Sequence, residues 1–391
     1  MTDILILDAA RTAVGGFGGS LAGTPPTDLA TTVAAAAMER AGVDPAQVGT
    51  TVFGHVINTE PRDMYLSRVA AIGAGVPETV PAMNVNRLCG AGLQAVISGA
   101  HALAAGDAEV ALVGGAECMS RAPHATQAMR WGAKMGDAGV MDMMLGALNC
   151  PFGTGHMGVT AENVAAEHGV SRADQDAFAL ESQTRAARAI AEGLFADQIV
   201  PVMVKRRRDT VAFDTDEHPK ATTAEALAGL RPAFAKDGSV TAGNASGIND
   251  GAAALVLATG SAAAREGWTP KARLLGWATA GVRPEVMGIG PVPAVERLLA
   301  RTGLAAADFD VIESNEAFAA QAVAVNRALG LDPARVNPDG GAIALGHPVG
   351  ATGAIILCKA LHALHRTGGR RALATMCIGG GQGIAVAIER V

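Results

Sequence analysis

Cys89 lies in a stretch whose residue types favour a reactive thiol. The stretch "NRLCGAG" (86–92) separates the strand-like "VPAMNV" from "GLQAVISGAHALAAG", which has apolar residues at helical spacing. Unpaired N–H groups and the positive end of the helix dipole gather at a helix start, so they stabilise a thiolate and lower the pKa of the thiol. The sequence therefore indicates a nucleophile at Cys89, whereas the alternative is a small buried side chain in the core.

His347 lies in a second turn that precedes a helix. In "ALGHPVGATG" (344–353) it comes just before Pro348, and proline is favoured in the first turn of a helix. A histidine there can act as the general base for a thiol. The alternative is a turn or cap histidine with no chemical role.

Cys377 ends an apolar strand, and three glycines follow it in "ATMCIGGGQGIAV" (374–386). Because another strand comes next, the glycines join two strands and do not begin a helix. This argues against a dinucleotide-binding fingerprint, in which the glycine-rich loop precedes a helix. The sequence also lacks the phosphate-binding pattern G-x-x-x-x-G-K-[ST]. Glycines beside a cysteine allow backbone N–H groups to face a developing oxyanion. The alternative is a tight hairpin alone.

Asn315 lies between a strand and a helix in "VIESNEAFAAQAVAVNRALG" (311–330), and the pattern predicts that the helix begins near it. An ordinary helix cap would suffice to explain an asparagine at this place. The functional alternative is a polar group that positions a water or a histidine.

Strand and helix signals alternate along the first part of the chain. "ILILDA", a helix at about 27–41, "TVFGHV", a helix at about 63–74 and "PAMNV" precede the Cys89 helix and "AEVALVGGAE". This alternation predicts a layered α/β fold with a mixed or parallel sheet. The loop-rich region 120–247 reads as an insertion, with a helical stretch at 159–193 that is broken near 169–171, and 250–259 returns as a strand.

The last third of the chain repeats the first. The segments that begin at Val85 and Val336 both run through a strand end, a loop, a helix and an apolar strand that ends in Gly-Gly. One long unit in each half indicates duplicated halves and not a solenoid. When the two segments are aligned, Cys89 and His347 occupy equivalent places, each near the start of a helix. If the halves pack with twofold symmetry, these two helix starts would face the same centre.

Bulk composition limits the classes of function. The chain has 391 residues, so two or three domains are expected, and its net charge of −6 argues against a nucleic-acid binder. We expect no signal peptide and no apolar run of membrane-spanning length. The five cysteines are odd in number and lack a C-x-x-C pair, so neither a disulfide framework nor a zinc or other metal site is expected, and a reducing cytoplasm is the simplest location.

Two further features have competing interpretations. The basic run "KRRR" (205–208) is a solvated loop face or a phosphate site. Six of the 14 methionines fall between 129 and 157, where they provide adaptable core packing or a malleable apolar channel.

Taken together, the motifs "NRLCGAG", "GGAECMS", "TAGNASG", "NEAF", "GGAIALGHPVGATG" and "CIGGGQG" resemble the thiolase family across essentially the whole chain. They stand in the family's order and at its spacing. The segments "NTEPRDMYLSRVA" and 130–165 look most like bacterial biosynthetic acetyl-CoA acetyltransferases, especially the broader β-ketothiolases associated with polyhydroxyalkanoate synthesis.

The resemblance implies a role for each matching residue. Cys89 would accept the acyl group, and His347 would take its proton and help to bind the thioester oxygen. Cys377 would remove the α-proton of the second acyl-CoA, and Asn315 would hold the water that completes one oxyanion hole. The N–H groups of Cys89 and Gly379 would form the other hole. Lys220 stands about where an arginine often contacts the coenzyme A nucleotide. The substrate and coenzyme A positions are Leu148, His156, Met157, Lys220, Phe234, Ala242, Ser246, Met287, Ala317 and Phe318.

The resemblance also implies a fold, substrates and an assembly. Two similar halves in a five-layered α-β-α-β-α arrangement would be formed by 1–119 with 248–270 and by 271–391, with 120–247 as a loop domain over the coenzyme A site. Acetyl-CoA and short-chain acyl-CoA would be the substrates, with no metal or redox cofactor, and a cytoplasmic homotetramer is expected.

Two other classes of protein compete with this interpretation. A Cys–His–Asn hydrolase would use Cys89, His347 and Asn315, but it leaves Cys377 and the duplication without a role. A non-enzymatic acyl-CoA-binding scaffold would need none of these four reactive positions.

Overall fold

A ten-stranded sheet runs through the computed structural model, which describes residues 2–391. The strands follow the order β4-β3-β5-β12-β1-β13-β16-β15-β14, and the short β2 pairs with β12. Their bounds are β1 Ile4–Arg11, β2 Gly15–Gly16, β3 Thr50–Gly54, β4 Ala82–Val85, β5 Val110–Cys118, β12 Asn249–Thr259, β13 Ala272–Gly281, β14 Val311–Ser314, β15 Arg371–Ile378 and β16 Gln382–Arg390.

The sheet consists of two halves with the same pairing pattern. In the first half β3 is parallel to β4 and β5, while β5 is antiparallel to β12 and β12 to β1. In the second half β14 is parallel to β15, which is antiparallel to β16, and β16 to β13; a parallel bridge between Ile312 and Val336 takes the place of β4. The predicted duplication is therefore confirmed.

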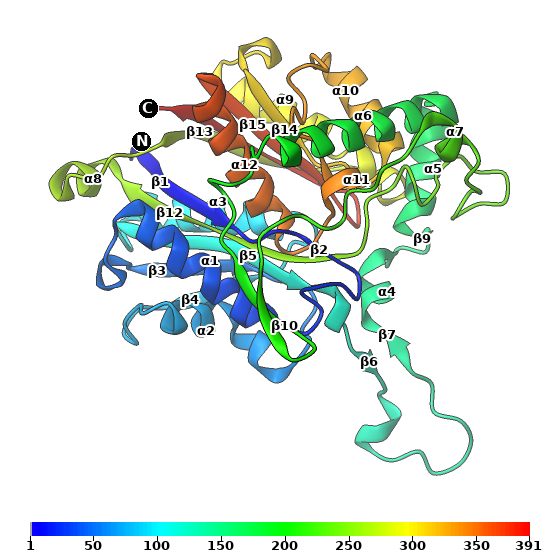
Figure 1. The fold of residues 1–391 in the computed structure, drawn as a ribbon, viewed down its shortest axis with the longest axis horizontal. Coiled ribbons are helices and arrows are strands. Elements are labelled where there is room, and N and C mark those ends of the chain that lie inside the picture. Colours follow the sequence, from blue (N-terminus) through cyan, green and yellow to red (C-terminus); the bar gives the residue numbers. More distant parts are fainter. Residues whose placement is uncertain (1) are drawn as a thin grey trace.

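Helices cover both half-sheets in the five layers that were expected. Two helices, α3 (Ala91–Ala105) and α12 (Thr352–Thr367), lie between the half-sheets and share one apolar core with both. The outer face of the first half is covered by α1 (Pro26–Ala41) with α2 (Leu66–Gly73) beside it, and that of the second half by α9 (Pro291–Thr302). Figure 1 shows α3 and α12 at the centre, with α1 and α9 on opposite sides.

The two central helices touch at a pair of glycines. A Cβ atom on Gly92 would lie 2.5 Å from the backbone nitrogen of Ala354, and one on Gly353 would overlap the backbone nitrogen of Leu93. These glycines are thus the matching positions of the two halves. Cys89 precedes α3 by two residues and His347 precedes α12 by five, so both lie near helix starts but the predicted equivalence of their register was wrong.

The region between β5 and β12 carries its own helices and short hairpins. The predicted break in the 159–193 helix is confirmed, because α5 ends at Glu167 and Ser171 caps α6 by accepting the N–H of Asp174. The residues 123–142 project from the body as an arm (Figure 1). The elements of the insertion are β6 His124–Ala125, β7 Met141–Asp142, α4 Met143–Leu148, β8 Asn149–Cys150, β9 Gly155–His156, α5 Met157–Glu167, α6 Arg172–Ala191, β10 Val202–Arg206, β11 Asp209–Phe213 and α7 Ala224–Ala228.

The remaining α-helices of the described chain are α8 (Gly260–Glu266), α10 (Ala319–Leu329) and α11 (Ala342–Leu345). The predicted helix start near Asn315 was wrong, because Phe318 is the residue that precedes α10. The residues 315–318 form an irregular segment instead, in which the N–H of Asn315 donates to Thr375 and the carbonyl of Ala317 accepts from Ser246.

One stretch of the described chain is long and apolar enough to cross a membrane by composition, contrary to expectation. It is Leu88–Ala105, with a mean hydropathy of 1.4 over 18 residues. In the structure this stretch contains α3, which is packed between the two half-sheets.

Candidate active site

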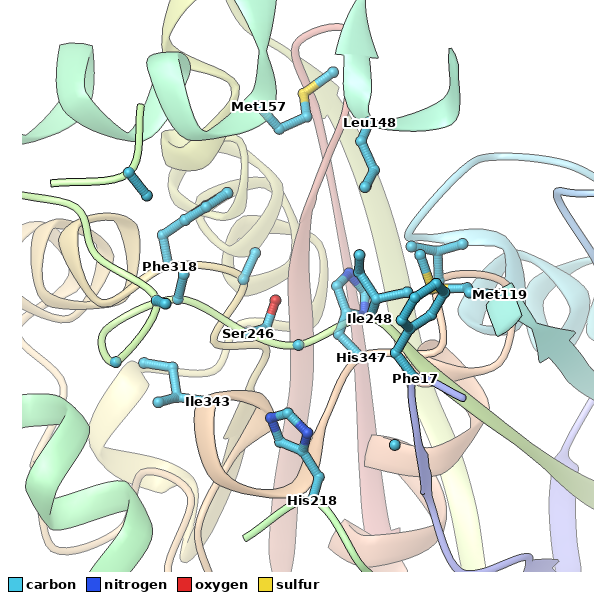
Figure 2. Close-up of a pocket in the computed structure, with 18 of the residues that line it drawn as sticks. Phe17, Met119, Leu148, Met157, His218, Ser246, Ile248, Phe318, Ile343 and His347 are labelled. Atoms are coloured by element: carbon cyan, nitrogen blue, oxygen red, sulfur yellow. The ribbon is translucent and has the colours of Figure 1, made fainter. Parts of the chain in front are cut away.

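A mostly apolar cavity of about 880 Å³ reaches Cys89, His347 and Gly379 from the surface. Figure 2 shows its walls, where His347 lies among Phe17, Met119 and Ile248. Every substrate and coenzyme A position that the sequence predicted lines this cavity: Leu148, His156, Met157, Lys220, Phe234, Ala242, Ser246, Met287, Ala317 and Phe318.

Cys89 lies on a sharp turn between β4 and α3. The preceding residue, Leu88, has φ +47°, a left-handed conformation that costs a residue with a Cβ atom some strain. The side chain of Asn86 supports the turn by accepting the N–H of Leu88 at 2.9 Å. Gly90 follows, and a Cβ atom there would lie 2.5 Å from Cδ1 of Ile378, so a larger residue would displace that side chain. The turn thereby presents the thiol to the cavity directly ahead of the helix.

Burial, and not the helix start, dominates the electrostatics of Cys89. It raises the pKa of the Cys89 thiol, while the N–H groups of Gly379 and of Cys89 itself lower the pKa by a smaller amount and the carboxylate of Glu117 raises it further. The predicted lowering of this pKa was therefore wrong for the protein at rest. The thiol needs a base to take its proton, and two backbone N–H groups already face its sulfur.

His347 is held by two hydrogen bonds. Its backbone N–H donates to Oδ1 of Asn249 at 2.9 Å, and its ring Nδ1 lies 2.7 Å from Oγ1 of Thr352. Nearby, the N–H of Gly350 donates to the buried carboxylate of Glu117 at 3.0 Å. Burial lowers the pKa of His347 to about 4, so the imidazole is neutral and able to accept a proton near neutral pH. The ring bonds to Thr352 and not to Asn315, so the contacts of a Cys–His–Asn hydrolase are not formed.

Cys377 lies at the end of β15, behind the cavity wall. It is fully buried among apolar side chains that include Met157 and Met287. Burial raises the pKa of the Cys377 thiol strongly, and the charge of a Cys89 thiolate raises it further. The two sulfurs therefore interact electrostatically, and both cannot easily be ionised at once.

The glycines after Cys377 form the predicted hairpin between β15 and β16. Gly380 and Gly381 have φ +83° and +88°, and a Cβ atom on Gly381 would overlap the carbonyl oxygen of Val282. Gly379 faces the cavity, where a Cβ atom would lie 3.1 Å from Cε of Met157. The backbone N–H of Gly379 donates to the Cys89 sulfur.

Asn315 is buried and both polar atoms of its side-chain amide lack a hydrogen-bond partner in the described chain. It does not cap α10, so the simple structural interpretation fails. It lines a small internal cavity of about 20 Å³ together with Ser314 and Thr352, the residue that contacts His347. An amide with free donor and acceptor atoms beside this site fits a role in positioning a water or a polar group.

Three aromatic rings form one wall of the cavity. His156 stacks on Phe234 with ring centroids 4.7 Å apart, and Phe234 meets Phe318 edge-on at 6.1 Å. Nδ1 of His156 accepts the N–H of Gly158 at 3.0 Å, and burial lowers the pKa of this histidine. The wall is therefore uncharged near neutral pH and suits an apolar or amide-containing chain.

Several lining residues were missed by the sequence analysis. Phe17, Met119, Ile248 and His218 all face the cavity (Figure 2). Phe17 lies between glycine pairs in "GGFGG", a pattern typical of a loop that carries no mark of this site. His218 lies two residues before Lys220, and Gly247 is the glycine against which its ring packs.

The structure shows where the methionines and the basic run lie relative to the cavity. Of the six methionines between 129 and 157 only Met157 lines the cavity, and Met129 and Met135 are exposed on the projecting arm. Neither of the two interpretations, core packing or an apolar channel, describes most of these six methionines, although Met119 and Met287 join Met157 in the cavity wall. The run 205–208 forms an exposed hairpin tip between β10 and β11 and does not line the cavity.

All five cysteines are free thiols. Within residues 2–391 no three His, Cys, Asp or Glu side chains are grouped so that they could hold a metal ion.

Comparisons with known proteins place this architecture in one family. The N-terminal domain of thiolases matches residues 4–261 and the C-terminal domain matches residues 268–390. The chain therefore belongs to the thiolase family, whose characteristic fold and duplicated halves it has. Within the family it is similar to β-ketothiolases and acetyl-CoA acetyltransferases, which are acyltransferases.

The similarity covers whole chains. The sequence is 58% identical to beta-ketothiolase BktB of Cupriavidus necator over 391 residues, which are 100% of this chain and 99% of that protein. It is 50% identical to an acetyl-CoA acetyltransferase of the same organism, with 100% of both chains covered. The crystal structure of the Bacillus anthracis acetyl-CoA acetyltransferase superposes with a TM-score of 0.97 at 44% identity, covering 100% of this chain and 99% of that one. The crystal structure of human mitochondrial 3-ketoacyl-CoA thiolase superposes with a TM-score of 0.98 at 42% identity, covering 100% of this chain and 99% of that one.

Proposed function

We propose that this thiolase catalyses the reversible Claisen condensation of two acyl-CoAs to a short-chain 3-ketoacyl-CoA and coenzyme A, through an acyl-cysteine intermediate. One observation carries the proposal: a cavity ends at a thiol, Cys89, that has both a neutral histidine and a second, electrostatically coupled thiol beside it. A hydrolase would need only one of the two thiols.

The first half-reaction transfers an acetyl group to Cys89. His347 takes the thiol proton on Nε2 while the sulfur attacks the thioester carbon of acetyl-CoA. Asn315 holds a water that, together with His347, stabilises one oxyanion, and the N–H groups of Cys89 and Gly379 stabilise the other. The bond between the carbonyl carbon and the coenzyme A sulfur then breaks, and the departing thiolate takes the proton from His347.

The second half-reaction forms the carbon–carbon bond. Cys377, as a thiolate, takes a proton from the α-carbon of a second acetyl-CoA, and the resulting enolate attacks the carbonyl carbon of the acetyl group on Cys89. The bond between that carbon and the Cys89 sulfur then breaks to give acetoacetyl-CoA, and the departing Cys89 thiolate takes the proton that Cys377 holds. Cys377 must be ionised for this step, and a Cys89 thiolate would oppose that ionisation. An acylated Cys89 carries no charge, so it does not oppose the ionisation of Cys377.

The apolar wall supports short acyl groups beyond acetyl as substrates. Met119, Met157 and Met287 line the cavity, and flexible thioethers adapt to one extra methylene group at small cost. We therefore expect turnover of a five-carbon as well as a four-carbon 3-ketoacyl-CoA, which is tested by thiolysis of acetoacetyl-CoA and 3-ketovaleryl-CoA. Measurable activity on the first with none on the second would contradict this expectation.

Lys220 and the residues near it are proposed to bind the coenzyme A nucleotide. The side chain of Lys220 is exposed at the cavity, and its backbone N–H donates to Gln183 at 2.9 Å. An ammonium group contacts a phosphate as a point charge and lacks the planar fork of arginine. Coenzyme A thioesters are the substrates, and we propose that no cofactor takes part.

Incubation with acetyl-CoA tests the reaction directly. Mass spectrometry should show acetoacetyl-CoA and coenzyme A as products and an added acetyl group on Cys89. Release of acetate would point to a hydrolase, and unchanged acetyl-CoA would point to a binding protein without activity.

We also propose a cytoplasmic homotetramer. The projecting arm exposes Trp131 at 87% and Met135 at 97%, which is unusual for large apolar side chains unless another subunit covers them. The edge strand β4 carries the exposed Met83 and lies beside the exposed Tyr65, so it offers a second apolar contact surface. Light scattering during gel filtration tests the assembly, and the double variant W131D/M135D should form smaller assemblies than the parent protein.

A further inference from the structure

Thr352 forms a hydrogen bond with the ring of His347, yet the proposed chemistry gives it no role. It is the first residue of α12 and is buried, and its Oγ1 lies 2.7 Å from Nδ1 of His347. The same Oγ1 lies 2.8 Å from the carbonyl oxygen of Pro348. On the other side of the imidazole, Nε2 is buried and has no hydrogen-bond partner in residues 2–391.

Counting hydrogens decides which ring nitrogen of His347 is protonated. A threonine hydroxyl has one hydrogen to donate, whereas a carbonyl oxygen can only accept. If the hydroxyl donated to Nδ1, two oxygen atoms would face each other at 2.8 Å with no hydrogen between them. If the hydroxyl donates to Pro348, as helical threonines commonly donate to the carbonyl four residues back, then Nδ1–H donates to Oγ1 and both contacts contain a hydrogen.

We infer that Thr352 is a positioning residue, which holds His347 in the tautomer with hydrogen on Nδ1 so that the lone pair of Nε2 is available to the thiol of Cys89. This inference rests on the proposed function and deepens it. The proton leaves the Cys89 sulfur for Nε2, and it passes from Nε2 to the departing coenzyme A sulfur. The Nδ1–H···Oγ1 bond is the same before and after each transfer, so the ring needs no rearrangement between its neutral and protonated forms.

The choice of a hydroxyl as the partner also has a consequence for proton return. A carboxylate beside Nδ1 would favour the protonated ring by its full charge, whereas a hydroxyl orients the ring without adding a charge. The carboxylate of Glu117 bonds to the N–H of Gly350 and not to the ring. His347 therefore binds the proton weakly and gives it up readily when coenzyme A departs.

The test compares variants in the first half-reaction alone. Purified full-length parent protein and the variants Thr352→Val and Thr352→Ser are mixed with acetyl-CoA, and intact-protein mass spectrometry follows acetylation of Cys89 with time. Valine keeps the shape of threonine but neither donates nor accepts, so both tautomers become available and a buried ring nitrogen loses its partner. We expect the acetylation rate at saturating acetyl-CoA to fall about 10- to 100-fold, with the half-saturating concentration changed less than about twofold.

The conservative variant and a matched control separate this role from a structural one. Thr352→Ser restores the hydroxyl and should acetylate within about threefold of the parent rate. Thr367→Val removes an equivalent hydroxyl at the other end of α12, where Oγ1 donates to Ala363 at 2.8 Å and makes no hydrogen bond to a histidine ring. It should acetylate at the parent rate, and thermal melting of all three variants shows whether each is folded.

Each outcome bears on one of the two proposals. A parent protein that is never acetylated on Cys89 overturns the proposed function itself. A parent protein that is acetylated, with a folded Thr352→Val variant reacting equally fast, overturns the role of Thr352 alone. A Thr352→Ser variant as slow as Thr352→Val also overturns it, because the hydroxyl would then not be what matters.

Discussion

Replacing Cys377 by alanine should separate the two half-reactions. The substitution removes one sulfur atom from a fully buried position and leaves Cys89, His347 and the N–H of Gly379 in place. Acetylation of Cys89 should therefore continue, whereas condensation should fail because no base remains for the α-proton.

The size of the effect follows from the role of the lost group. Removal of a general base slows a proton transfer by about 10²–10⁴-fold, which corresponds to about 3–5 kcal/mol in activation free energy. The loss of a buried sulfur costs about 1 kcal/mol in free energy of unfolding, as for a typical core substitution. The effect on condensation should thus greatly exceed any effect on stability.

The assay measures both steps in one preparation. Intact-protein mass spectrometry after mixing with acetyl-CoA gives the acetylation rate, and formation of acetoacetyl-CoA gives the condensation rate. Cys358→Ala is the matched control, because Cys358 is also a fully buried thiol but lies in α12 away from the cavity. It should leave both rates close to those of the parent protein.

Two results would refute the reasoning. A folded Cys377→Ala variant that condenses at the parent rate would remove Cys377 from the mechanism. A folded variant that cannot be acetylated would mean that the roles of Cys89 and Cys377 are exchanged or shared.

Three further predictions concern stability. Lys359→Met should lower the free energy of unfolding by about 3–5 kcal/mol in denaturant titrations, because it leaves the buried carboxylate of Glu313, which Lys359 contacts at 2.8 Å, without its partner charge. A loss of less than about 1 kcal/mol would contradict this prediction. Gly92→Ala should destabilise by about 1–3 kcal/mol or more, since its Cβ atom would lie 2.5 Å from a backbone nitrogen, whereas Gly146→Ala, with open space around it, should be neutral or slightly stabilising in the same titration. Burial lowers the pKa of His362 to about 4, whereas an ordinary histidine in the unfolded chain has a pKa of about 6.5. Between these two pH values the unfolded chain binds more protons than the folded protein, so the free energy of unfolding falls as the pH drops from about 6.5 to about 4. His362→Gln should therefore narrow the difference in melting temperature between about pH 7 and about pH 5, and an unchanged difference would count against this cause.

Local sequence patterns predicted the elements well where local forces decide them. The break between α5 and α6 followed from Gly169 and the capping Ser171, and the hairpin after Cys377 followed from its three glycines. The start of α10 could not be predicted this way. The residues 315–318 make hydrogen bonds to Thr375 and Ser246, which are distant in sequence, and these bonds engage the segment ahead of the helix.

The sequence predicted which residues line the site, but not the direction in which the pKa of Cys89 is shifted. Motif positions brought Cys89, His347 and the ten predicted lining residues to one cavity. The sign of the pKa shift at Cys89 depends on burial by both halves of the chain, which a helix start does not reveal. Composition also could not tell that Met129 and Met135 lie on an exposed arm while Met119 and Met287 line the cavity.

The place of β1 in the sheet has a consequence for synthesis of the chain. All eight residues of β1 are buried, and they pair with residues 253–259 and with Ala272 and Arg273. At about 5–20 residues per second, a ribosome needs roughly 12–50 s after making β1 to deliver these partners. During that time an apolar strand, "ILILDAA", leaves the ribosome without either neighbour. Nascent chains are therefore most exposed to aggregation before the second half emerges, and slower production at low temperature or a chaperone that covers the first strand should raise the yield of folded protein.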